Sequence, residues 1–231
     1  MSPRVHGTGL PTLAAVFARL HLVRHGEVHN PDGVVYADLP GFPLSALGRA
    51  QAAATAQHLA DSGITVLVTS PLDRARETAG FIARRLGIEA VADPGLTEWG
   101  LSMRWAGEPW LGLDRRFPGE VAAYAADPAA LPFVPESLDE VAARMTAVVT
   151  AWGNRHPGAL AAVVSHQDPI HALRRSLCGR GFADFHADKP THASVVTLQP
   201  SAGAWTEIAF WTPDMASAPF PPPTADLTDG R

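Results

Sequence analysis

The sequence predicts a three-layer α/β domain with a mostly parallel central sheet. Three apolar segments have the length and pattern of buried strands, residues 19–24, 64–69 and 159–164, and a helical segment follows each one before the next strand. Alternation of strands and helices is typical of parallel sheets that are covered by helices on both faces. Ligands of such sheets gather beyond the carboxyl ends of the strands, so the residues directly after each strand are the first candidates for a functional site.

The first predicted strand, residues 19–24, ends where the chain must turn sharply. Its sequence alternates and then becomes apolar, and His25-Gly26 follows at once. The glycine permits the turn, so the strand delivers Arg24 and His25 to its carboxyl edge. After a loop rich in Pro, Gly and Asp, Ser45 is placed to cap an alanine-rich helix.

The second strand, residues 64–69, leads directly into a predicted helix start. Ser70 offers a capping hydroxyl, and Pro71 suits the first turn of a helix. The helix is expected to end near Gly87, which would place Arg74 in its first turn.

The third strand, residues 159–164, follows a long helix that a capping box opens at Ser137 and Glu140. Beyond this strand come Ser165 and His166, and then Asp168-Pro169, which repeats the pattern of a cap and a proline at a helix start. Two closing strands are predicted at residues 193–198 and 205–210.

One domain is predicted over residues 19–211, with loosely attached segments on either side. Residues 1–18 are interrupted by Pro and Gly and are interpreted as an N-terminal extension, and residues 212–231 form a Pro/Ala-rich tail that is predicted to be disordered. Within the domain, residues 96–118 are an irregular insertion that contains three tryptophans. These tryptophans would either line the mouth of a pocket or cover the core.

Composition narrows the classes of partner. The net charge is -5, with 18 Lys and Arg against 23 Asp and Glu, and no basic stripe suggests a nucleic-acid partner. The chain has no apolar run long enough to span a membrane, and its single cysteine, Cys178, rules out an internal disulfide. We therefore expect a cytoplasmic protein with no membrane, metal or cofactor, and leave open whether it forms a homo-oligomer.

Four side chains with the chemistry of an anion site follow the predicted strands. Arg24 and His25 come after the first strand, Arg74 after the second and His166 after the third. Guanidinium groups match phosphate oxygens, and an imidazole can act as a nucleophile. Each residue alone would more often be structural, but the joint placement predicts a site for a small phosphorylated substrate.

Three motifs resemble those of the histidine phosphatase superfamily, which includes the cofactor-dependent phosphoglycerate mutases. Residues 22–27 (LVRHGE) are similar to the signature of that family, residues 70–79 (SPLDRARETA) to its second motif, and residues 164–166 (VSH) to its late histidine. The resemblance covers about residues 20 to 200 and implies a phosphoglycerate mutase-like fold. It also implies that His25 is phosphorylated during the reaction.

The resemblance assigns roles to further residues. Arg24, Arg74 and His166 would bind the transferring phosphoryl group, and Asn30 would contact it from the following loop. Glu98 lies where relatives place their general acid. Asp168 is the rival for this role, because another branch of the family uses an aspartate just after the late histidine; here Gln167 intervenes, and Glu98 is preferred.

The predicted activity is metal-independent hydrolysis of a phosphomonoester through a phosphohistidine at His25. Two alternatives stay open: a phosphotransferase of the phosphoglycerate mutase type, and a catalytically silent module that binds phosphorylated ligands. The segment after Glu98 lacks the basic, tyrosine-containing stretch that is associated with the mutases, which favours hydrolysis. Sugar phosphates, phospholipid headgroups and phosphorylated cofactor precursors all stay open as substrates.

Overall fold

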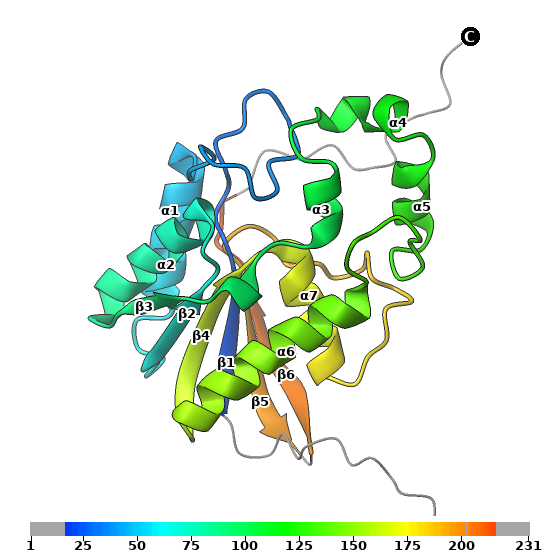
Figure 1. Cartoon of the computed structure of the whole chain (residues 1–231). Helices are drawn as coiled ribbons and strands as arrows, with labels where there is room; N and C mark the ends of the chain where they lie inside the picture. Colours follow the sequence, from blue (N-terminus) through cyan, green and yellow to red (C-terminus); the bar gives the residue numbers. More distant parts are fainter. Residues whose placement is uncertain (1–16, 202, 216–231) are drawn as a thin grey trace, which may run out of the picture.

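A six-stranded sheet forms the centre of the computed structural model, which describes residues 17–201 and 203–215 (Figure 1). The strand order is β3-β2-β4-β1-β5-β6. Strands β1 to β4 are parallel to one another, whereas β5 pairs antiparallel with both β1 and β6, so the prediction of a mostly parallel sheet is confirmed. The bounds are Phe17–Arg24 (β1), Val66–Thr69 (β2), Ala90–Ala92 (β3), Ala159–Ser165 (β4), Val195–Ser201 (β5) and Ala204–Trp211 (β6).

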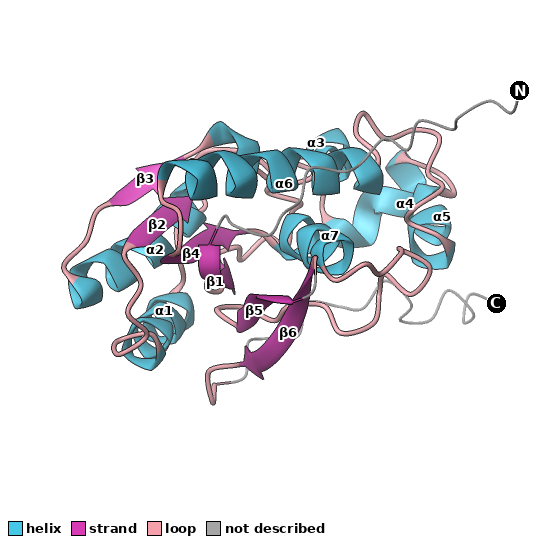
Figure 2. Ribbon diagram, turned by 90° about the horizontal axis from the view of Figure 1, so that it is seen from below, coloured by secondary structure: helices cyan, strands magenta, loops and turns pink. Residues whose placement is uncertain are grey.

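Helices cover both faces of the sheet and bury two separate cores (Figure 2). Helices α1 (Ala46–His58) and α2 (Asp73–Leu86) pack on one face, and α6 (Leu138–Arg155) and α7 (Gln167–Leu177) pack on the other. Successive side chains of a strand point to opposite faces. In β1, accordingly, Leu22 joins the core under α6 and α7, and Val23 joins the core under α1 and α2.

The segment between β3 and α6 contains short helices rather than the irregular chain that was predicted. Its bounds are η1 (Pro94–Leu96), α3 (Gly100–Arg104), η2 (Trp110–Gly112), α4 (Leu113–Arg116) and α5 (Glu120–Ala126). Trp99 and Trp105 are buried in the core, whereas Trp110 is half-buried and lines a cavity. Both roles considered for the tryptophans therefore occur, each in different residues.

Two predicted helix starts are confirmed. The Ser45 side chain accepts a hydrogen bond from the Gly48 amide at the start of α1. Ser137 and Glu140 form the capping box of α6. Local pairing of a side chain with the first turn was enough to place these ends.

Two predicted helix starts are wrong. Helix α2 begins at Asp73 rather than at Pro71, and Ser70 does not cap it, because the Ser70 backbone still pairs with Val164. Helix α7 begins at Gln167, before Asp168, so Asp168 is not its cap. In both cases the polar side chain bonds to another segment instead of capping the helix: Ser70 to His166, and Asp168 to Lys189.

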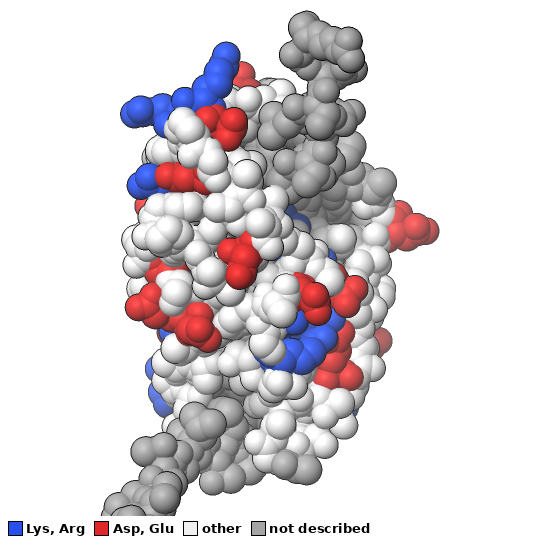
Figure 3. Space-filling view, turned by 90° about the vertical axis from the view of Figure 1, so that its right-hand side faces the viewer, with Lys and Arg blue, Asp and Glu red and all other residues white. Residues whose placement is uncertain are grey.

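The outer surface carries both signs of charge. On the face shown in Figure 3, acidic and basic side chains lie interspersed. Among the described residues, no helix combines the length and the apolar character that crossing a bilayer requires. The N-terminal extension was predicted over residues 1–18, but Phe17 and Ala18 belong to β1, where Phe17 pairs with Ala159 and is buried. The tail was predicted over residues 212–231. Residues 1–16 and 216–231 of these two segments lie outside the described residues.

Helix α1 touches the loop after β1 so closely that only glycine fits at the contact. A Cβ atom on Gly48 would collide with the Glu27 carbonyl, and one on Gly26 would collide with Gly48. Both contacts are with backbone, which cannot rotate away. The pair therefore holds the residues that follow His25 against α1.

We predict that Gly48→Ala lowers the free energy of unfolding by about 1–3 kcal/mol, as overpacking does. Gly80→Ala is the matched control: it is also inside a helix, and its new Cβ would meet only the far end of the Arg84 side chain. The control should be neutral or should stabilise the protein by up to about 1 kcal/mol through helix propensity. Urea unfolding followed by circular dichroism measures both, and equal effects would contradict the close-contact argument.

Candidate active site

Three segments that are far apart in the sequence meet at the carboxyl edge of β1, β2 and β4. The β1 residue Arg24 pairs with Ser165 of β4, and the amide of His25 donates to the Ser165 carbonyl at 3.0 Å. The Ser70 amide donates to the Val164 carbonyl at 2.8 Å. The rings of His25 and His166 consequently lie 5.2 Å apart, between centroids.

The imidazole of His25 is held in one tautomer. Its Nδ1 lies 2.7 Å from the Gly26 carbonyl oxygen, which can only accept, so Nδ1 carries the proton. Its Nε2 accepts a hydrogen bond from Arg74 Nε at 3.2 Å. Burial, reinforced by the Arg74 charge, lowers the pKa of His25 well below its usual value, so the ring is neutral and presents a lone pair at Nε2.

Arg74 is the most constrained cation of the site. Its side chain is buried, its Nη2 donates to the Ala37 carbonyl at 2.7 Å, and its guanidinium lies over the Tyr36 ring, 4.7 Å from the centroid. Nη2 also lies 3.8 Å from Oε2 of Glu98. These contacts orient the guanidinium plane and leave it beside the lone pair of His25.

Arg24 and His166 each keep one buried polar atom without a hydrogen-bond partner among the described residues. Arg24 donates from Nη1 to Pro190 and from Nη2 to His192, but its Nε has no such partner. His166 bonds to the Ser70 hydroxyl through Nε2 at 2.7 Å, and its Nδ1 has none. Buried polar atoms of this kind are costly and point to a bound group that would satisfy them.

Glu98 lies at the edge of this cluster. Its Oε1 accepts from the Trp99 amide at 2.8 Å, and its Oε2 lies 3.7 Å from His166 Nδ1. Burial is the main cause that raises the pKa of Glu98; the Asp168 charge adds to the rise, and the Arg74 charge opposes it. A raised pKa favours the protonated acid that can donate to a leaving group.

Asp168, the rival acid, is engaged elsewhere. Its Oδ1 lies 2.8 Å from the ammonium of Lys189, the only lysine of the sequence. Lys189 also donates to the Tyr124 hydroxyl at 2.8 Å. This ion pair holds Asp168 as a carboxylate partner of Lys189.

Asn30 uses its amide to hold the loop after β1. Its Nδ2 donates to the Val34 carbonyl at 2.8 Å, and its Oδ1 accepts from the Val34 amide at 3.1 Å. The residue lines the cavity next to the cluster. Its predicted contact with phosphate stays a prediction.

Two contributors to the cluster were not predicted: His192 lies outside the three motifs, and Ser70, in the second motif, was expected to cap a helix. His192 accepts from Arg24 Nη2 at 2.9 Å and lies 5.7 Å from the His25 ring, and the Ser70 hydroxyl binds His166. The signal for His192 is topological. Because β5 is antiparallel to β1, the residues just before β5 lie at the carboxyl edge of β1.

A metal ion in a protein is held by several His, Cys, Asp or Glu side chains placed around it. Within residues 17–201 and 203–215, no three of these side chains are placed to hold one. The polar atoms of the cluster are mostly nitrogen donors, which suits an anion.

Known proteins are similar to this chain in sequence and in fold. The family model of the histidine phosphatase superfamily (branch 1) matches residues 20–211. This chain belongs to that superfamily. An uncharacterised protein of Mycobacterium tuberculosis is 43% identical over 170 residues, which are 70% of this chain and 79% of the relative.

Among the named relatives are phosphatases and, over a shorter match, a probable phosphoglycerate mutase of Serratia proteamaculans, which is 40% identical over 80 residues, 35% of this chain and 37% of that protein. A glucosyl-3-phosphoglycerate phosphatase of Mycolicibacterium vanbaalenii is 33% identical over 168 residues, which are 70% of this chain and 74% of that protein. The solved structure of a mycobacterial glucosyl-3-phosphoglycerate phosphatase complexed with VO3 has a TM-score of 0.74 and 29% identity, and the match covers 83% of this chain and 97% of that one. These likenesses confirm the predicted phosphoglycerate mutase-like fold.

We predict that the protein loses stability steeply as the pH falls below 6.5. Burial lowers the pKa of five buried or half-buried histidines, and partial burial also lowers that of His58, so the unfolded chain binds protons there that the folded chain does not, and the free energy of unfolding falls with pH. Urea unfolding at pH 7.0 and 5.5 should differ by at least about 2 kcal/mol. The five are His21 (to about 4), His171 (to about 3), His192 (to about 2), His25 and His166.

The variant His171→Phe isolates one contribution. His171 is buried beside Phe185, and neither of its ring nitrogens has a hydrogen-bond partner among the described residues. The substitution should remove about 1 kcal/mol of the pH-dependent loss, whereas the exposed control His156→Phe should keep the loss of the native protein. Equal unfolding free energies at the two pH values would contradict the prediction.

Proposed function

We propose that this protein is a phosphomonoester hydrolase that acts through a phosphohistidine at His25. The observation that carries the proposal is the neutral His25 ring, whose Nε2 lone pair is directed at the Arg74 guanidinium and lies beside His166. A nucleophile and a set of donors for phosphoryl oxygens thus occupy one buried cluster.

In the first step, Nε2 of His25 attacks phosphorus in line, and the bond from phosphorus to the alcohol oxygen breaks. The Arg74 Nε–H, which donates to Nε2 in the structure, would turn to an equatorial oxygen of the phosphoryl group. The partnerless Arg24 Nε and His166 Nδ1 suit two further contacts with that group. Each preorganised donor is typically worth about 3 kcal/mol of transition-state stabilisation.

Glu98 is proposed as the acid and base of the reaction. Its carboxyl group lies within 3.8 Å of Arg74 and 3.7 Å of His166, at the edge of the phosphoryl site. Protonated Glu98 would give its proton to the departing alkoxide. The resulting carboxylate would then take a proton from the water that attacks phosphohistidine, which restores both residues and releases phosphate.

Hydrolysis is preferred to phosphoryl transfer between substrates, and catalysis to silent binding. The relatives named as phosphatases match 70% and 83% of this chain, whereas a probable phosphoglycerate mutase matches 35% of it, and this difference supports hydrolysis. The presence of both His25 and Glu98 in the cluster supports catalysis, since binding alone would need neither a nucleophile nor an acid. The guanidinium groups supply the positive charge that a phosphoryl transition state needs, so the proposed steps require no metal or cofactor.

The proposal is tested with His25→Ala. This variant should lose at least about 1,000-fold in kcat for para-nitrophenyl phosphate, because loss of a nucleophile removes the covalent route. The native protein should release free phosphate and, after brief mixing, carry acid-labile phosphate at His25. His156→Ala, a histidine at the far end of α6, should keep full turnover. Undiminished turnover in His25→Ala with a native circular dichroism spectrum would reject the nucleophile.

Glu98→Gln should reduce turnover of alkyl phosphates by about 100-fold and of para-nitrophenyl phosphate much less, because nitrophenolate leaves without a proton. Asp168→Asn is the matched comparison, since it makes the same change from carboxyl to amide in the rival acid. Its losses should be independent of the leaving group. If only Asp168→Asn shows the dependence on the leaving group, Asp168 is the acid.

A further inference from the structure

A cavity of about 410 Å³ adjoins the cluster of His25 and the two arginines. Tyr36 and His192 line the cavity and also belong to the cluster: Tyr36 lies under the Arg74 guanidinium, and His192 accepts from Arg24. A phosphoryl group bound at His25 would therefore direct its alcohol part toward this space. The cavity is the site on which substrate choice depends.

The two walls of the cavity are joined by backbone hydrogen bonds. The Trp110 amide donates to the Gly33 carbonyl, and the Val35 amide donates to the Glu108 carbonyl, each at 2.9 Å. One wall is the loop after β1 and the other is the chain around η2. Because both are tied together in the folded protein, the cavity is preformed rather than assembled by the ligand.

The charge of the lining is one-sided. Among the described residues that line the cavity, Glu27 and Asp32 carry carboxylates and none is Lys or Arg. His192 adds no charge, because burial and Arg24 lower its pKa to about 2. An anionic group on the alcohol part would be repelled by these carboxylates, and no Lys or Arg among the described lining residues, which also include His29, offsets that repulsion.

The arginines nearest in sequence to the cavity residues do not line the cavity. Arg115 and Arg116 follow the lining residues in α4 but lie outside the lining, and Arg116 is 3.5 Å from the carboxylate of Glu108. The single lysine of the chain, Lys189, is paired with Asp168. The cations of the site are those that would hold the phosphoryl group itself.

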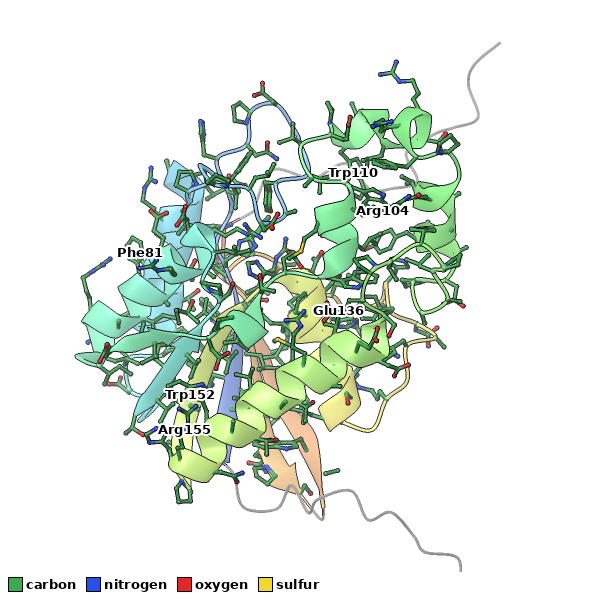
Figure 4. The ribbon with its side chains drawn as sticks, in the orientation of Figure 1. Phe81, Arg104, Trp110, Glu136, Trp152 and Arg155 are labelled. Atoms are coloured by element: carbon green, nitrogen blue, oxygen red, sulfur yellow. The ribbon has the colours of Figure 1, made fainter. Side chains whose placement is uncertain are left out.

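The rest of the lining near η2 is apolar. Trp110, labelled in Figure 4 beside α3, packs edge to face on the buried Trp105, with ring centroids 6.0 Å apart and an interplanar angle of 82°. The Trp105 indole is itself fixed by its hydrogen bond to Glu120 at 2.9 Å. Leu111 also lines the cavity and extends this apolar surface outward, where it is 86% exposed.

We infer that the alcohol part of the substrate carries no negative charge and presents an apolar or aromatic face to Trp110 and Leu111. This inference rests on the proposed hydrolysis at His25 and names the substrate class for it. It disfavours bisphosphates and phosphorylated carboxylic acids, in which a second anion would enter between Glu27 and Asp32.

The first test compares phenyl phosphate with 4-carboxyphenyl phosphate at pH 7.5. The two phenols have similar acidity, so the pair differs mainly in one negative charge. The native protein should favour phenyl phosphate by at least about 10-fold in kcat/KM, as repulsion in a partly shielded site would produce. A ratio near one overturns the inference and leaves the proposed hydrolysis intact.

Variants identify the residues that discriminate. The double variant Glu27→Gln/Asp32→Asn should lower the ratio by at least about 3-fold, whereas Glu89→Gln, an exposed carboxylate at the opposite end of the sheet, should leave it unchanged.

Trp110→Ala should raise KM for phenyl phosphate about 10-fold with less change in kcat, as lost ground-state contact does. Trp211→Ala, on the edge strand β6, is its control. Selectivity that is unaffected by both cavity variants would overturn the assignment.

A binding measurement separates the inference from the proposed function. Phenylphosphonate and 4-carboxyphenylphosphonate cannot be hydrolysed, so calorimetry reports the choice of the cavity without turnover. Tighter binding of phenylphosphonate in a protein that releases no phosphate would reject hydrolysis and retain the charge selection. Equal binding of the two would overturn the charge selection whether or not the protein is active.

Discussion

The hydrogen bond from Arg74 Nε to His25 Nε2 is the interaction around which the site is organised. It requires a buried guanidinium, and burial of a charge is tolerated only when its donors are satisfied. The Ala37 carbonyl accepts from Nη2, and the neighbouring Tyr36 ring lies against the guanidinium. The Glu98 carboxylate, from a different segment, lies 3.8 Å from Nη2 and offsets the charge. Each of these contacts also limits where the arginine can go, so the conditions that make the cation stable also position it for a phosphoryl group.

The same burial also changes the pKa values of His25 and Glu98. The environment that lowers the pKa of His25 keeps its ring neutral and nucleophilic, and burial raises the pKa of Glu98. A neutral base and a protonated acid can therefore coexist within a few ångströms. The two arginines retain their charge, because guanidinium groups are effectively always protonated in proteins.

In the proposed reaction, different parts of the chain contact the phosphoryl group and the alcohol part of the substrate. The strand ends supply the nitrogen donors, while the loop after β1 and the segment around η2 form the cavity beside them. The close contact of Gly26 with Gly48 holds the first of these loops against α1. The strand ends form a rigid rim, and the loops form a separate wall. The loops can therefore vary while the residues of the rim stay the same.

The sequence by itself determined the layered sheet, the starts of α1 and α6, and the meeting of Arg24, His25, Arg74 and His166, because caps, periodic apolar segments and strand ends are local patterns. Only the tertiary structure decided that Ser70 binds His166 instead of capping a helix, and that Asp168 pairs with Lys189. In both cases a polar side chain had a local and a distant partner. Which partner wins depends on packing between segments, and that information is spread over the whole chain.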